Sequence, residues 1–114
     1  MPSKIYTLTI DAFDPHALAR FWAAVLDFKI TSEEPEEVVI EAPDETLAIL
    51  FGRGDDEKVS KNRLHLDLNP DDQAAEVERL KRLGATEVDI GQKDVTWVVM
   101  ADPEGNEFCV LRAR

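Results

Sequence analysis

The chain has 114 residues, which suits one domain and leaves no room for a second core. Its 24 acidic and 13 basic residues give a formal charge of −11, and such a field repels nucleic-acid phosphates. The single cysteine, Cys109, excludes an internal disulfide, and no apolar run has the length of a membrane span. The first residues show no secretory signal pattern, so we expect a cytoplasmic protein with neither nucleic-acid nor membrane partners.

The first half of the chain predicts one helix among four strands. Residues 5–10 alternate as in a strand, and Asp14-Pro15 then supplies an N-cap and a first-turn proline. The apolar face of the helix consists of residues at helical spacing, Leu18, Phe21, Trp22 and Val25. Three more strands are predicted at residues 28–32, 37–41 and 47–51.

After a polar linker at residues 54–61, the second half repeats this order. A strand is predicted at residues 63–68, and Asn69-Pro70 repeats the cap-plus-proline signal. Ala74, Val77 and Leu80 form the predicted apolar stripe of the second helix, and Gly84 is placed to end it. The remaining strands are predicted at residues 86–90, 95–100 and 107–111, with a tight turn at residues 102–106 joining the last two.

The organisation is therefore βαβββ followed by βαβββ, a repeat of about half the chain. We expect an α+β fold made of module one, at about residues 1–53, and module two, at about residues 62–114. Helices with one apolar face, next to strands in which apolar and polar residues alternate, favour a sheet that is covered by helices on one face only. The other face is then free to line a binding site.

Three segments carry a family resemblance that spans the whole chain. They are Asp14-Pro15 through Phe21-Trp22 and Leu26, then Leu64-His65-Leu66-Asp67, and then residues 102–108, Asp-Pro-Glu-Gly-Asn-Glu-Phe. In this order, the chain resembles the glyoxalase/bleomycin-resistance/dioxygenase superfamily, whose members are also called vicinal oxygen chelate proteins. The resemblance implies a curved eight-stranded cup, with the two helices on its convex face.

The same resemblance implies where a metal would bind. In metal-dependent members, the first and last strands of each module contribute one ligand each, in the order histidine or glutamine, glutamate, histidine, glutamate. Counting from the helix and turn residues of this chain places these positions at Thr7, Ile49, His65 and Cys109. Only His65 matches, and both glutamates are missing, so we predict no metal and no other cofactor. A divalent metal remains the alternative, either through His65 and Cys109 or through a set of His65, Asp67 and Glu107.

Strand alternation places further residues on the inner face of the cup, where polar groups would meet water or a ligand. The predicted ligand-binding residues are Thr7, Thr9, Ile49, Phe51, Arg63, Asp67, Trp97 and Cys109. His65 is the candidate catalytic residue, a general acid or base oriented by an aspartate. Alternatives stay open: Arg63 can simply pair with Asp67, Cys109 can be a small buried residue rather than a nucleophile, and Trp97 can pack in the core.

These observations leave three hypotheses for function. The first is a metal-free homodimer of the bleomycin-resistance kind that binds a small organic molecule in the cup. The second is a lyase, isomerase or dioxygenase of the same superfamily that uses a metal or His65. The third is a structural or regulatory interaction module.

Overall fold

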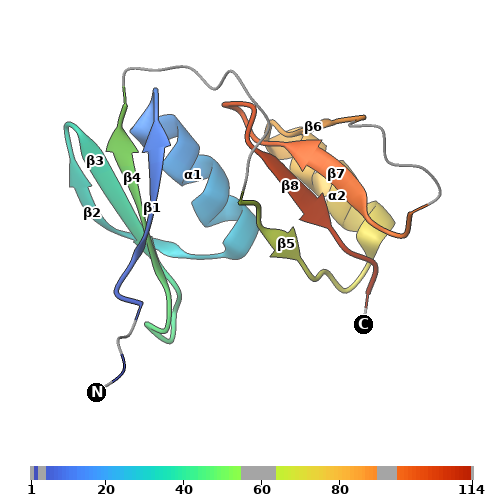
Figure 1. Ribbon diagram of the computed structural model, residues 1–114, viewed down its shortest axis with the longest axis horizontal. Coiled ribbons are helices and arrows are strands. Elements are labelled where there is room, and N and C mark those ends of the chain that lie inside the picture. The colour runs from blue at the N-terminus through green and yellow to red at the C-terminus, as the bar shows by residue number, and fades with distance from the viewer. Residues whose placement is uncertain (1, 3–4, 55–63, 90–94, 114) are drawn as a thin grey trace. The chain divides into compact units, whose positions relative to one another are not determined.

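The computed structural model describes residues 2, 5–54, 64–89 and 95–113 (Figure 1). The chain divides into two compact units, Met1–Glu57 and Lys58–Arg114, for which we keep the names module one and module two. Each unit buries residues between its own helix and sheet, so the expectation of no room for a second core is wrong. In the described part of each module, four strands form one sheet and a single helix follows the first strand. The predicted α+β class and the repeated βαβββ order are therefore confirmed.

Module one contains β1 (Leu8–Ala12), α1 (Pro15–Leu26), β2 (Lys29–Glu34), β3 (Glu37–Glu41) and β4 (Ala48–Arg53). Its sheet has the order β1-β4-β3-β2, and β1 runs parallel to β4. The helix begins as predicted, because the Asp14 carboxylate accepts a hydrogen bond from the Ala17 amide at 3.1 Å and Pro15 occupies the first turn. It ends at Asp27, whose φ of 56° is left-handed.

The core of module one lies between α1 and the sheet, since the helix packs on β3 and β4 (Figure 1). The sheet side of this core consists of fully buried residues that pair across the two strands, Val38 with Phe51 and Ile40 with Ile49. The helix contributes Leu18, Phe21 and Trp22, and the two aromatic rings meet edge to face at 5.1 Å. The helical stripe predicted from the sequence is thus the buried face.

Module two contains β5 (Asp67–Leu68), α2 (Gln73–Leu83), β6 (Thr86–Glu87), β7 (Val98–Ala101) and β8 (Glu107–Val110). Its sheet order, β5-β8-β7-β6, repeats that of module one, with β5 parallel to β8. On β8, the buried Phe108 and Val110 alternate with the half-buried Glu107 and Cys109. Because α2 packs on β8, Phe108 and Val110 face the helix, and Cys109 lies on the opposite face.

Of three predictions for α2, the structure confirms the residue that ends the helix and corrects its N-cap and its buried face. Gly84 ends the helix as expected, with a φ of 119°. The N-cap is Asp72 and not Asn69, because the Asp72 carboxylate accepts a hydrogen bond from the Ala75 amide at 3.1 Å. Ala74 is exposed, so Val77 and Leu80 alone bury the helix on the sheet.

The two modules differ by one residue at the hairpin that precedes their last strand. In module two, the Asp102 amide donates to the Asn106 carbonyl at 2.9 Å, and Gly105 turns with a φ of 86°. In module one, the matching bond runs from the Ala42 amide to the Leu47 carbonyl at 2.9 Å, which encloses one more residue. Counting forward from these closing bonds, Leu50 of β4 corresponds to Cys109 of β8.

No helix in the described ranges is long and apolar enough to cross a membrane.

Candidate functional site

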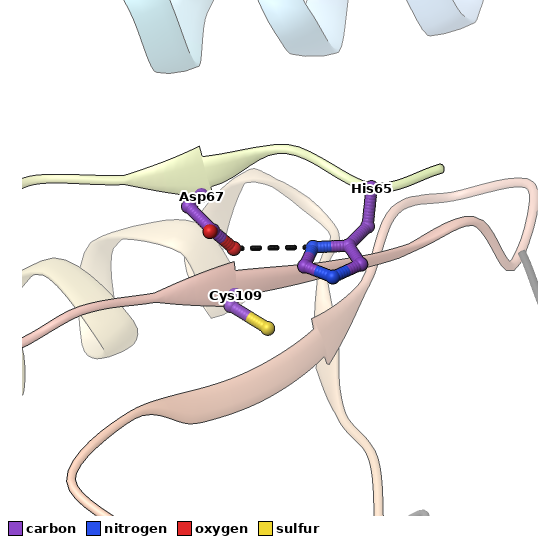
Figure 2. Close-up of side chains that lie close together, drawn as sticks. All are labelled: His65, Asp67 and Cys109. Carbon is purple, nitrogen blue, oxygen red and sulfur yellow. Dashed lines mark ion pairs between the residues drawn. The ribbon is translucent and has the colours of Figure 1, made fainter. Parts of the chain in front are cut away.

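Three different metal-binding and acid–base side chains meet on module two, on the face opposite α2 (Figure 2). They are His65, just before β5, Asp67 at the start of β5, and Cys109 in the middle of β8. One nitrogen, one carboxylate oxygen and the sulfur of these residues all lie within 4.8 Å of one another. We call these residues the His65 cluster.

Strand pairing explains why these residues converge. Asp67 and Cys109 are register partners in the parallel pair of β5 and β8, so their side chains project from the same face. The Cys109 amide also donates to the Leu66 carbonyl at 2.9 Å, which holds the two strands together at this point. His65 lies two residues before Asp67 and therefore returns to the same side of the chain.

The His65 cluster is accessible and internally paired. The Nδ1 atom of His65 lies 3.1 Å from the Asp67 carboxylate oxygen Oδ1, and these side chains are 42% and 51% exposed. Because Nδ1 lies beside this carboxylate, the second ring nitrogen, Nε2, is left to accept or donate a proton elsewhere. The Cys109 sulfur lies beside this pair in Figure 2 and is only partly exposed. The arrangement therefore has the parts for general acid–base chemistry or for binding a cation.

The matching positions of module one have no such chemistry. Thr9 of β1 pairs with Leu50 of β4, where module two has Asp67 and Cys109. The Thr7 hydroxyl donates to the Ala48 carbonyl at 3.1 Å and so reinforces the pairing of the two strands. Thr9 is exposed and remains a predicted ligand-binding residue.

Two predicted ligand-binding residues of module one are wrong. Ile49 and Phe51 are 1% and 0% exposed and lie on the face that α1 covers, so they belong to the hydrophobic core. Ile49 lies six residues after Pro43, as Cys109 lies six residues after Pro103, but the extra residue at the first hairpin shifts this count by one. A one-residue shift moves a strand side chain to the other face of the sheet. Leu50, and not Ile49, occupies the position that corresponds to Cys109, and the unequal lengths of the two hairpins account for the difference.

The remaining predictions for module two have mixed outcomes. Trp97 lies just before β7 and is 40% exposed, so it is accessible. The segment before β7 is held by the Gln73 side-chain amide, which donates to the Thr96 and Val110 carbonyls at 2.9 and 3.0 Å. Arg63 lies outside the described residues. Glu107, proposed as a metal ligand with His65 and Asp67, is not in the cluster, and Cys109 takes its place.

Comparisons with known proteins agree with this fold. The family described as "Glyoxalase-like domain" matches residues 7–111. A sequence comparison with curated proteins finds no match. Among solved structures, a glyoxalase/bleomycin resistance protein/dioxygenase family enzyme from Burkholderia phytofirmans PsJN is 19% identical. The match covers 91% of this chain and 94% of that one, with a TM-score of 0.71.

Two fosfomycin resistance proteins, both named FosX, are also similar. The Mesorhizobium loti protein is 16% identical, with a TM-score of 0.72 and coverage of 100% and 94% of the two chains. The Listeria monocytogenes protein, solved with Mn(II) and a sulfate ion, is 16% identical, with a TM-score of 0.76 and coverage of 100% and 93%. The fold is therefore that of the vicinal oxygen chelate class. The chain belongs to the glyoxalase-like domain family.

The metal implied by these relatives can be tested against the residues present. At the four positions that carry ligands in metal-dependent members, this chain has Thr7, Leu50, His65 and Cys109. Neither module one residue offers a nitrogen, a sulfur or a carboxylate oxygen, and Leu50 has no donor atom. Mn²⁺ prefers oxygen-rich sites, and these four residues supply no carboxylate at all. The four positions do not fit such an ion, although the His65 cluster itself is a group that could hold a metal.

Proposed function

We propose that this protein binds a small organic molecule on the face of module two opposite α2, without the four-ligand metal centre of its metal-dependent relatives. The observation that supports this proposal is the half-exposed His65–Asp67 pair, joined at 3.1 Å on a strand whose partner carries Cys109. Small-molecule sites combine apolar walls with a few well-placed polar groups. The imidazole, carboxylate and thiol supply such groups, and the accessible indole of Trp97 is available for stacking.

The relatives indicate the kind of ligand to try first. Their names refer to bleomycin and fosfomycin resistance, and resistance by binding requires only a site that holds the drug. For this chain we propose a homodimer in the cytoplasm that retains such a molecule. We propose the dimer because members of the superfamily often form dimers, and the location because the sequence predicts a cytoplasmic protein.

The test is a thermal-shift measurement on protein stripped of metal with a chelator, using fosfomycin, bleomycin and a panel of aromatic and carboxylic acid metabolites as probes. A probe at ten times its Kd stabilises the native state by about 1.4 kcal/mol, which raises Tm by roughly 5–10 °C in a domain of this size. We expect this shift to disappear in His65→Ala. The matched control is His16→Ala, because His16 also pairs with a carboxylate, Glu33, but on module one. The proposal fails if no probe raises Tm, or if His65→Ala responds like the wild-type protein.

A second candidate is a histidine-dependent enzyme of the lyase, isomerase or dioxygenase type. The 3.1 Å contact favours it, because a carboxylate beside Nδ1 orients the ring and leaves Nε2 to exchange a proton with a substrate. Turnover of a bound probe that is lost in both His65→Gln and Asp67→Asn would favour this enzyme over simple retention. Binding without turnover would favour retention.

A further inference from the structure

The His65 cluster combines three donor types, and two of them, imidazole nitrogen and thiolate sulfur, are donors that a hard, oxygen-seeking cation does not select. Imidazole nitrogen and thiolate sulfur are preferred by Zn²⁺ and by other late divalent ions, and zinc also accepts one carboxylate oxygen. A site with three protein ligands and one open position is the usual form of a reactive zinc site. The cluster therefore has both the ligand number and the ligand types for Zn²⁺.

Charge favours the same ion. When Cys109 binds as a thiolate and Asp67 as a carboxylate, their two negative charges balance a dication, and His65 contributes a neutral nitrogen. The chain as a whole carries a formal charge of −11, which attracts cations to its surface. The equivalent residues of module one, Thr9 and Leu50, supply no negative charge to balance a dication.

The geometry requires only a small adjustment. Zinc–ligand bonds of about 2.0–2.3 Å in a tetrahedral site place the donor atoms roughly 3.3–3.6 Å apart. The His65 nitrogen and the Asp67 oxygen are already 3.1 Å apart, and all three donors lie within 4.8 Å of one another. The thiol must therefore close by roughly 1.2–1.5 Å at most, which side-chain rotation of partly exposed residues can supply. The backbones of Asp67 and Cys109 are fixed by strand pairing (Figure 2).

We propose that His65, Asp67 and Cys109 bind one Zn²⁺ ion within module two, with a fourth position open to water or to a ligand. This site differs from the four-ligand centre of the relatives. Its ligands come from two adjacent strands of one module, it replaces a carboxylate with a thiolate, and it adds Asp67. It goes beyond the proposed function, because it requires no organic ligand.

The experiment uses the metal-stripped full chain with Zn²⁺ alone, titrated by calorimetry, and with Co²⁺ as a spectroscopic substitute. We expect one Zn²⁺ per chain, and a Co²⁺ complex with a thiolate-to-cobalt charge-transfer band and the visible bands of a tetrahedral ion. Cys109→Ser, His65→Ala and Asp67→Asn should each weaken zinc binding by more than the roughly 10- to 100-fold that follows removal of a group that only orients a ligand. Cys109→Ser should also abolish the charge-transfer band.

The matched controls are His16→Ala and Glu33→Gln. They alter an exposed histidine–carboxylate pair that is joined at 2.9 Å on module one and lies in the half of the chain that has no cysteine. Both variants should bind zinc with wild-type affinity. A Co²⁺ complex without the thiolate band, zinc binding unchanged in Cys109→Ser, or zinc binding weakened 100-fold by the controls would overturn the assignment. Because no organic probe is present, the zinc result and the small-molecule result can fail independently.

Discussion

Module one and module two share a strand order and a helix position, yet they differ in chemistry on the face opposite the helix. Thr9 and Leu50 form the parallel pair of module one at the place where Asp67 and Cys109 pair in module two. The helix-covered faces, by contrast, are equally apolar, with Ile49 and Phe51 in one module and Phe108 and Val110 in the other. Burial under a helix constrains a strand side chain to be apolar, and the opposite face is free of this constraint.

The contrast between the two modules depends first on which face of β4 lies in the hydrophobic core. Phe51→Ala removes a fully buried ring packed under α1, so we expect the free energy of unfolding to fall by about 3–5 kcal/mol. Leu50→Ala, on the opposite face, removes a partly exposed side chain and should cost clearly less. Urea denaturation of both variants measures this difference. Equal losses, or a larger loss for Leu50→Ala, would mean that the two faces are wrongly assigned.

The ends of the two helices offer a finer comparison. Gly84 ends α2 with a φ of 119°, and a side chain there would meet only the Pro103 ring at 3.7 Å, so the cost of Gly84→Ala comes from the backbone. We expect a loss of about 1–2 kcal/mol. Asp27 ends α1 with a φ of 56°, and Asp27→Gly should stabilise the protein by at most about 1 kcal/mol. Changes in Tm of opposite sign confirm the comparison, and a Gly84→Ala variant as stable as wild type contradicts it.

The histidine–carboxylate pair of module one should make the stability of the protein depend on pH. His16 has acceptors at both ring nitrogens, the Glu33 carboxylate at 2.9 Å from Nδ1 and the Pro35 carbonyl at 3.2 Å from Nε2. These bonds, the one to Glu33 above all, raise the pKa of His16 above its ordinary value of about 6.5. The ring therefore joins α1 to the end of β2, through Glu33, and to the turn that follows it, through Pro35.

Because the pKa of His16 is higher in the folded chain than in the unfolded chain, its stabilising contribution is complete below about pH 6.5. The contribution is lost as the pH rises through the folded pKa. We therefore expect the difference in unfolding free energy between wild type and His16→Gln to shrink from pH 6 to pH 8, measured by urea denaturation. Glu33→Gln, which removes the main cause of the raised pKa, should reduce this pH dependence. A difference that grows with pH would contradict the assignment.

Much of the fold follows from local patterns in the sequence. The stripe of Leu18, Phe21 and Trp22, the cap at Asp14 and the stop at Gly84 each depend on a few neighbouring residues, and all three agree with the structure. Asn69 failed as a cap because Asp72, three residues later, offers a carboxylate to the helix amides. Propensity alone does not choose between two suitable caps.

The site was harder to predict because it depends on register. His65, Asp67 and Cys109 were each singled out from the sequence, but no spacing rule brings residues 67 and 109 together without knowledge of the pairing of β5 with β8. The same limit explains the error at Ile49, since an unseen extra residue in one hairpin reverses the face of every residue counted beyond it.

The unequal hairpins also mark a place where the protein can be modified. Residues 43–46 at the tip of module one are exposed, and Glu45 adopts a φ of 60° there. This hairpin has one more residue than the hairpin of module two, yet the pairing of β3 with β4 still keeps each β4 side chain on its own face of the sheet. A short peptide tag or an unnatural amino acid inserted at Glu45 should therefore leave both cores intact. It would give a handle for immobilising the protein or attaching a dye while leaving Cys109, the single thiol, unmodified.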